Sequence, residues 1–132
     1  MDKEKVAEAV ARAVDAFNSG RYHEALDGFE VPYHEGGRAS RDLWLGLIRA
    51  SAALYHFERG QHLSAKRLHA SSREVLARQG SPATLPGGGD RKLDIAALLA
   101  DLEAVFAPLA AASGEEAAAL RPASRPRMRL LG

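Results

Sequence analysis

The chain of 132 residues contains no cysteine, which excludes disulfides, thiolate metal ligands and cysteine nucleophiles. Aromatic residues are scarce at 6%, and no stretch approaches the roughly 18 consecutive apolar residues of a membrane-spanning helix. The opening residues, MDKEKVAEAVARAV, are charged and amphipathic and lack the apolar centre of a signal peptide. We therefore expect a cytoplasmic protein that does not interact with membranes.

The body of the chain also lacks a strong excess of charge of either sign. The net charge is +1, but the last twelve residues hold four arginines and no acid: Arg121, Arg125, Arg127 and Arg129. Removing these four from 18 basic residues leaves 14 against 17 acidic ones, so we do not expect nucleic acid as a partner. The basic tail can attract an acidic surface, but it has no aromatic residue for base stacking.

Apolar residues recur at helical spacing along most of the chain, and they make up 46% of it. The pattern predicts five helices, from residue 6 to about 20, around 22–29, over 43–57, over 65–76 and over 95–109. We expect Pro32, followed by the Gly36-Gly37 pair, to stop the second helix and Asp90 to cap the fifth. The predicted fold is all-α, a compact bundle of about five helices built on two antiparallel helix-turn-helix hairpins. No strand is predicted.

Composition divides the chain near residue 112. We expect residues 1–112 to form a single all-helical domain, and residues 113–132 to form a short helix or turn followed by a basic, disordered tail. The longest loop is SPATLPGGGD at 81–90. Its three glycines, 87–89, could present backbone amides to an anion, but Asp90 would repel a phosphate, so a flexible linker is the better interpretation.

Two segments forty residues apart echo one another, FNSGRYHEA at 17–25 and FERGQHLSA at 57–65. The offset pairs Phe17 with Phe57 and Gly20 with Gly60. A glycine can take the left-handed conformation that ends a helix, so the echo predicts two similar hairpin turns. The pattern resembles a tetratricopeptide repeat, whose period is about 34 residues. The longer period here indicates a wider loop between the hairpins.

A more specific likeness lies in FNSGRYHEALDGFE, in GLI at 46–48 and in ASAALYHFERGQHLSAKRL at 50–68. Together they resemble the domain of unknown function 309 family, small all-helical bacterial and archaeal proteins without a settled activity. The resemblance covers residues 13–78. The positions that match the family signature include Phe17, Asn18, Gly20, Tyr22, Glu24, Gly46 and Gly60.

Some polar positions of that signature differ in this chain. Leu26 takes the place of the family histidine, and Asp27 replaces the glutamate beside it. Arg49 stands where the family has a glutamine. The resemblance therefore implies the fold, and this member is a diverged one. Asn18, Tyr22 and Glu24 match the signature although the forty-residue echo does not explain them.

The strongest cluster of polar residues predicted from the sequence joins the second and third helices. Asp27 and Glu30 lie on the second helix, and Arg49 and His56 share a face of the third. Turned toward each other, these four side chains would form a small anion or polar-ligand site. The alternative is that Arg49 simply neutralises Asp27 or Glu30.

The sequence gives little support for a metal site or a catalytic triad. Of the five histidines, at 23, 34, 56, 62 and 69, only His62 and His69 share a helical face, and their separation of seven does not suit a metal site. No serine lies in a strand-turn-helix elbow. We expect neither a metal nor a cofactor.

These observations favour a non-catalytic helical domain that acts as an interaction or small-ligand-binding module. The expected partner is an unknown protein or a small polar ligand, and a homodimer is compatible with apolar surface left by short helices. Two alternatives stay open. One is a small enzyme that uses Glu30 and His56 as acid and base. The other is a tetratricopeptide-like adaptor for a peptide or a partner helix.

Overall fold

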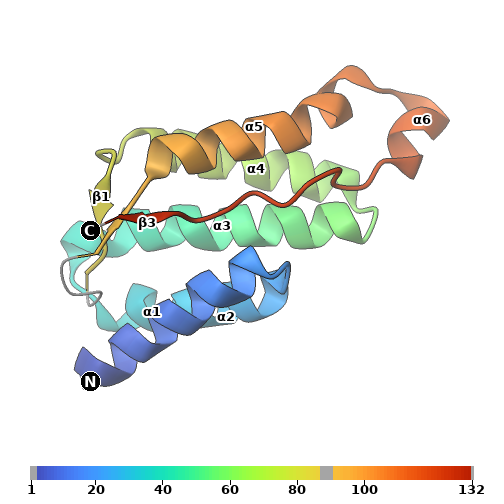
Figure 1. The fold of residues 1–132 in the computed structure, drawn as a ribbon. Helices are drawn as coiled ribbons and strands as arrows, with labels where there is room; N and C mark the ends of the chain where they lie inside the picture. Colours follow the sequence, from blue (N-terminus) through green and yellow to red (C-terminus); the bar gives the residue numbers. More distant parts are fainter. Residues whose placement is uncertain (1–2, 87–90, 132) are drawn as a thin grey trace.

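Six α-helices and a small sheet make up the part of the chain that the computed structural model describes, residues 3–86 and 91–131. The helices are α1 (Lys3–Asn18), α2 (Tyr22–Glu35), α3 (Arg41–Glu58), α4 (His62–Ala77), α5 (Ile95–Ala111) and α6 (Gly114–Ala119), with a 3₁₀ turn at Arg38–Ser40. Helices α1 and α2 form one hairpin and α3 and α4 the other (Figure 1). The predicted all-α bundle built on two hairpins is confirmed. None of the described helices has the length and apolarity needed to cross a membrane.

Helix α3 is the centre of the bundle, as its nearly continuous apolar sequence leads one to expect. Figure 1 shows α1 and α2 on one side of it and α4 and α5 on the other. Trp44 of α3 stacks on Phe29 of α2 with ring centroids 6.1 Å apart. At the other end of α3, Phe57 contacts Phe106 of α5 at 5.2 Å. One core therefore continues around α3 and joins both hairpins to α5.

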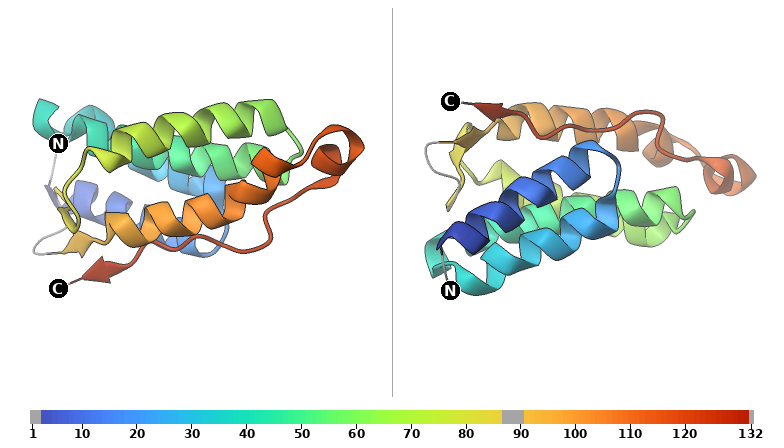
Figure 2. Two further views of the ribbon diagram at one scale, coloured as in Figure 1. Left: turned by 90° about the horizontal axis from the view of Figure 1, so that it is seen from above. Right: turned by 60° about the horizontal axis from the view of Figure 1, so that its bottom comes forward.

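Residues 121–131, which we call the C-terminal strap, return along the bundle next to α5 (Figures 1 and 2). The prediction of a disordered tail is corrected here. Met128 is only 2% exposed, and the Asn18 side chain holds its backbone at both groups. The Asn18 amide donates to the Met128 carbonyl at 3.0 Å, and the Met128 N–H donates to Asn18 Oδ1 at 2.7 Å.

The strap is extended because its apolar residues alternate with arginines. Pro126 and Met128 are buried and Leu130 is partly buried, while Arg127 and Arg129 are exposed. This period of two is the pattern of an extended chain with one face on a core. A prediction based on net charge overlooks this alternation.

The end of the strap joins a three-stranded antiparallel sheet that the sequence did not predict. Its strands are β1 (Ala83–Thr84), β2 (Lys92–Leu93) and β3 (Leu130–Leu131), in that order. Leu93 lies opposite Ala83 on one side and Leu130 on the other. Each strand has two residues, too few for any alternation to be recognised.

Helix α2 continues through Pro32 and ends at Glu35, directly before the predicted Gly36-Gly37 pair, so the glycines and not the proline mark its end. Proline lacks a backbone N–H, and its ring crowds the carbonyl four residues earlier. That residue is Gly28, which has no side chain of its own. The next turn is closed by the Gly36 N–H, which donates to the Pro32 carbonyl at 2.8 Å.

Helix α5 begins at Ile95, as the apolar pattern predicts, but its cap differs from the predicted one. Its N-cap is Asp94, whose side chain accepts a hydrogen bond from the Ala97 N–H at 3.0 Å. The predicted cap, Asp90, and the glycines at 87–89 lie outside the described residues. A carboxylate cap is correct in kind but is displaced by four positions, because the intervening residues enter β2.

Candidate functional site

The two hairpin turns have the same backbone geometry. Gly20 has φ of +80° and Gly60 has φ of +76°, a left-handed conformation that other residues rarely adopt. The Gly20 N–H donates to the Phe17 carbonyl at 3.1 Å, and the Gly60 N–H donates to the Phe57 carbonyl at 3.1 Å. The predicted pair of similar turns is confirmed.

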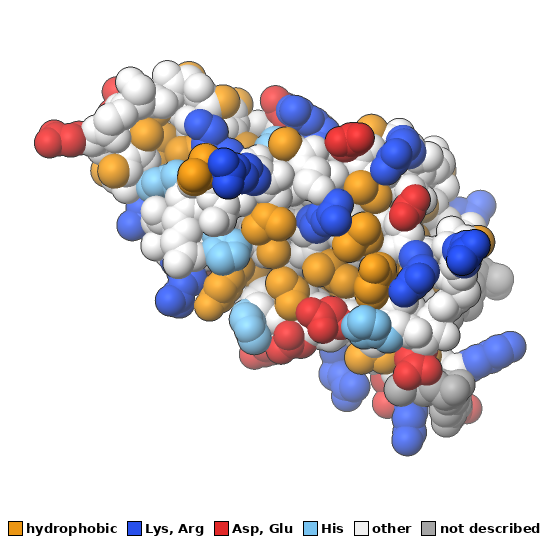
Figure 3. Space-filling model, turned by 180° about the vertical axis from the view of Figure 1, so that it is seen from behind, with side chains coloured by type: hydrophobic (Ala, Val, Ile, Leu, Met, Phe, Trp, Pro, Cys, Tyr) orange, Lys and Arg blue, Asp and Glu red, His pale blue; other side chains and the backbone are white. Residues whose placement is uncertain are grey.

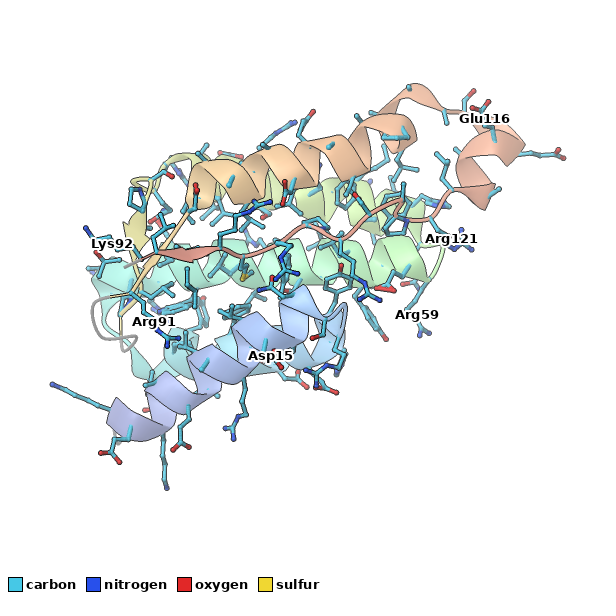
Figure 4. The ribbon with its side chains drawn as sticks, in the orientation of Figure 1. Asp15, Arg59, Arg91, Lys92, Glu116 and Arg121 are labelled. Atoms are coloured by element: carbon cyan, nitrogen blue, oxygen red, sulfur yellow. The ribbon has the colours of Figure 1, made fainter. Side chains whose placement is uncertain are left out.

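An arginine of the strap lies over each of these glycines. A Cβ atom on Gly20 would lie 2.9 Å from Nε of Arg125, and one on Gly60 would lie 2.8 Å from a terminal nitrogen of Arg121. Figure 4 shows Arg121 and Arg59 at this same end of the bundle, away from Arg91 and Lys92. The strap thus brings two guanidinium groups to the end where both hairpins turn.

These elements enclose a hollow of about 410 Å³, which we call the turn-end pocket. Its lining comprises Tyr22, the first residue of α2, Glu58, the last residue of α3, and strap residues 121–125. A neighbouring hollow of about 340 Å³ shares Tyr22 and Glu58 and adds Tyr55 and Arg59, among others. Tyr22 and Glu58 therefore stand between two connected depressions.

The Tyr22 hydroxyl is buried and has no hydrogen-bond partner among the described residues. Burying a hydroxyl without a partner is unfavourable, so such groups are rare in folded proteins. Among the described residues, the other buried side-chain atom without a partner is Nε1 of Trp44, which lies in the core against Phe29. Tyr22 differs from Trp44 because it lines a cavity that charged side chains also line.

At the position of the second hairpin equivalent to Tyr22, the side chain of His62 has a hydrogen-bond partner. Tyr22 packs edge-on against Phe17, with ring centroids 5.4 Å apart, and His62 packs in the same manner against Phe57 at 5.9 Å. Nε2 of His62 lies 2.9 Å from the Leu120 carbonyl oxygen, to which its N–H donates. The chain leading into the strap satisfies the polar atom at one turn and leaves it unpaired at the other.

The charges around the pocket shift two pKa values. Burial raises the pKa of the Tyr22 phenol to about 12, the negative charge of Glu58 adds to this, and Arg125 opposes it. Burial also raises the pKa of Glu58, again opposed by Arg125. Tyr22 is therefore a neutral hydroxyl at physiological pH, able to donate a hydrogen bond.

The two strap arginines that lie over the glycines, Arg121 and Arg125, differ in how they are held. Arg121 donates to the Ala118 and Leu120 carbonyls at 3.1 and 2.7 Å, which fixes it at the end of α6. Arg125 has no ion pair or hydrogen bond within the described residues, although its charge acts on both Tyr22 and Glu58. A free guanidinium beside an unpaired hydroxyl is a suitable arrangement for an anionic oxygen.

The structure does not gather the four predicted site residues into one cluster. Arg49 donates to the Ser71 hydroxyl of α4 at 2.6 Å, so it faces α4 and not α2. His56 pairs with Gln61 in the next turn. Asp27 lies 3.4 Å from His23, and both side chains are exposed.

Glu30 lies along α2 in a shallow hollow with Asp27 and His34. The face seen from behind in Figure 3 carries a band of apolar atoms bordered by acidic, basic and histidine side chains. Within the described ranges, no hydrogen bond or ion pair joins Glu30 to His56. The acid and base pair of the enzyme alternative therefore has no geometric support here.

Three positions of the family signature have clear structural roles. Asn18 holds the strap, as described above. Glu24 is an exposed partner of Arg21 at 2.8 Å. Gly46 allows α4 to approach α3, since a Cβ there would lie 2.6 Å from Cδ2 of Leu76.

The histidines make separate contacts. His69 stacks on Phe106 with ring centroids 4.2 Å apart, and burial lowers its pKa, an effect that Arg73 reinforces and Glu103 opposes. In the portion of the chain that is described, no group of three or more histidine, aspartate or glutamate side chains is placed to hold a metal ion.

Sequence reasoning missed Glu58, Arg121 and Arg125 as parts of one site. The echo pairs Asn18 with Glu58, so a comparison of polar residues at equivalent turn positions would have singled out Glu58. Nothing in the local sequence shows that Arg121 and Arg125 reach glycines 61 and 105 positions earlier.

Comparison with known proteins bears on the first half of the chain. Residues 10–68 match a family model described as Domain of unknown function (DUF309). Neither a curated protein nor a solved structure matches the chain significantly. The matched segment includes both hairpin turns, with Tyr22 and Glu58, but none of the strap arginines. The family resemblance read from the motifs is therefore confirmed, because residues 10–68 match the DUF309 family model.

Proposed function

We propose that this chain is a non-catalytic small-ligand-binding module, and that the turn-end pocket holds the anionic group of its ligand. The observation that carries the proposal is the buried Tyr22 hydroxyl, which has no partner although it lines a cavity with Arg125. A ligand oxygen would accept from this hydroxyl and would pair with the guanidinium.

The volume and charge of the site support this function. Pockets for small molecules occupy about 300–1,000 Å³, and the turn-end pocket measures about 410 Å³. Its lining contains two guanidinium groups and one carboxylate. The Arg125 side chain is exposed and lies across Gly20, beside the pocket.

The proposal is tested by titrating the full chain with sodium propionate, followed by ¹H–¹⁵N NMR at constant ionic strength set with sodium chloride. We expect propionate to shift the amide signals of Tyr22, Glu58 and residues 121–125 with a saturable dependence. Arg125→Gln should weaken propionate binding about tenfold or more, because a hydrogen bond to a charged group contributes about 1.5–3 kcal/mol.

Arg127→Gln is the matched control. Arg127 is an exposed strap residue outside the pocket lining. Its substitution changes the net charge by the same amount as Arg125→Gln but should leave propionate binding unchanged. If both substitutions weakened propionate binding equally, the binding would reflect general electrostatic attraction to the basic strap and not a specific site. Signals that move only with ionic strength would refute the binding site.

A further inference from the structure

The turn-end pocket contains a hydrogen-bond acceptor as well as donors, and this narrows the class of ligand. Glu58 ends α3 and projects its carboxylate into the lining, where it has no hydrogen bond or ion pair among the described residues. Arg125 and Tyr22 lie close enough for their charges and dipoles to interact with it. A simple anion would use the donors and would be repelled by Glu58.

We infer that the ligand carries an α-amino acid head group, whose carboxylate binds Arg125 and the Tyr22 hydroxyl and whose ammonium group binds Glu58. This inference rests on the function proposed above and names the ligand class for the same site. The carboxylate and ammonium groups of the ligand, both bonded to its α-carbon, would face the opposite charges of Arg125 and Glu58. The arrangement satisfies the orphan hydroxyl and the unpaired carboxylate with one molecule.

The neighbouring hollow offers room for the rest of such a ligand. It begins at Tyr22 and Glu58 and continues over Tyr55. The Arg59 guanidinium lies 5.2 Å from the Tyr55 ring centroid, and the His23 ring lies 5.4 Å from it on centroids. A ligand side chain that leaves the head group in this direction would meet an aromatic surface flanked by basic groups.

The inorganic alternative is less well matched. A phosphate ion could also bind between Arg121 and Arg125, since guanidinium groups bind phosphate well. It would place two negative charges beside Glu58 and would offer no ammonium to it. Phosphate is therefore included in the experiment to distinguish a phosphate ligand from an amino-acid ligand.

The experiment compares four probes against the full chain by the same NMR titration: L-alanine, propionate, N,N,N-trimethylglycine and inorganic phosphate. L-alanine and propionate differ only in the amine, and trimethylglycine keeps the positive charge but has no N–H donor. We expect L-alanine to bind about tenfold more tightly than propionate, as one charge-assisted hydrogen bond implies. Trimethylglycine should fall between them.

The Glu58→Gln variant tests whether Glu58 causes the preference for L-alanine over propionate. In this variant L-alanine should bind no more tightly than propionate, whereas propionate binding should be retained or strengthened because a repelling charge is gone. Glu115→Gln, an exposed acid on α6 outside the pocket, serves as the control with the same change in net charge.

The outcomes separate the two proposals. If propionate binds wild type as tightly as L-alanine, or if Glu58→Gln keeps the preference, the amino-acid inference is overturned while the anion site stands. If phosphate binds most tightly, the ligand class is a phosphate and the inference is also overturned. If no probe binds in the pocket, both the proposed function and the ligand class fail.

Discussion

The two hairpin turns share one backbone geometry and differ in what surrounds it. At the second turn, Gly60 is covered by an arginine held on two carbonyls, and His62 donates to Leu120. At the first turn, Gly20 is covered by Arg125, and neither this arginine nor the Tyr22 hydroxyl has a hydrogen-bond partner among the described residues.

This difference is the basis of the proposed binding role of the first turn. A repeated backbone with its polar atoms satisfied needs no further explanation than folding. Where the same backbone leaves a buried donor and a free guanidinium beside a cavity, the unfavourable burial indicates a role in binding. Substitutions in the two hairpins test whether this difference is real.

The largest effect is expected where the helices of each hairpin approach one another. A Cβ on Gly28 would lie 2.7 Å from the Ala13 Cβ and 3.3 Å from its backbone Cα, whereas one on Gly46 would meet the Leu76 side chain. Backbone cannot move aside as a side chain end can. We expect Gly28→Ala to lower the free energy of unfolding by about 2–3 kcal/mol and Gly46→Ala by about 1 kcal/mol, within the usual range for overpacking.

Urea denaturation monitored by circular dichroism measures both values. Alanine also favours helix over glycine by about 1 kcal/mol, so a neutral result at Gly46 would mean that the clash with Leu76 only cancels this gain, and full repacking of Leu76 would raise the stability. A larger loss at Gly46 than at Gly28 would contradict the view that the first hairpin is the more closely packed at its glycine.

The next effect concerns the strap, which Asn18 holds from the first hairpin. Asn18→Ala removes both hydrogen bonds to the Met128 backbone, and we expect it to lower the free energy of unfolding by about 1–2 kcal/mol. Asn18→Asp keeps the acceptor and loses the donor, so its effect should be intermediate. Faster amide hydrogen exchange at Met128 in both variants would show that the loss occurs at the strap.

The aromatic positions after each glycine should respond in opposite directions. His62→Phe removes the donor to Leu120 and should lower the free energy of unfolding by about 1 kcal/mol, whereas Tyr22→Phe removes an unpaired hydroxyl and should raise it by less than about 1 kcal/mol in ligand-free protein. Thermal unfolding of both variants tests this. A loss of stability in Tyr22→Phe would show that the hydroxyl has a partner in solution and would weaken the case for the pocket.

The smallest effect is a pH dependence at Glu58. Its pKa is raised in the folded protein, so its contribution to stability is fully present below the unfolded pKa, near 4.3, and is lost as the pH rises through the folded value. Glu58→Gln should therefore raise the Tm slightly at pH 7, and the difference from wild type should vanish below about pH 4. A constant difference across this range would exclude burial of the Glu58 carboxylate as its cause.

Much of the fold could be predicted because its causes are local. A glycine with positive φ after a helix and an apolar period near 3.6 act over a few residues, so the two turns and the helices were visible in the sequence. The errors at Pro32 and Asp90 were also local: a helix tolerated a proline, and a strand displaced a cap. The positions of helix ends depend on such competing local interactions.

The candidate site could be predicted only in part, because the sequence cannot tell which side of α3 a polar residue faces. Arg49 was expected to face α2 but contacts Ser71 of α4, since α3 has neighbours on both sides and its nearly uniform apolar sequence does not distinguish them. Asn18 and Tyr22 were recognised as unexplained by the repeat. Their partners could not be named, because these come from the other end of the chain.

The sequence by itself determined two hairpins with glycine turns, an all-helical bundle and the similarity of residues 10–68 to the DUF309 family. Only the tertiary structure decided that the strap crosses both turns, with Asn18 bound to a residue 110 positions away. The physical reason is that turn geometry follows from adjacent residues, whereas the strap position follows from burial of Met128 and from hydrogen bonds between distant segments. The pocket exists only where both kinds of interaction meet.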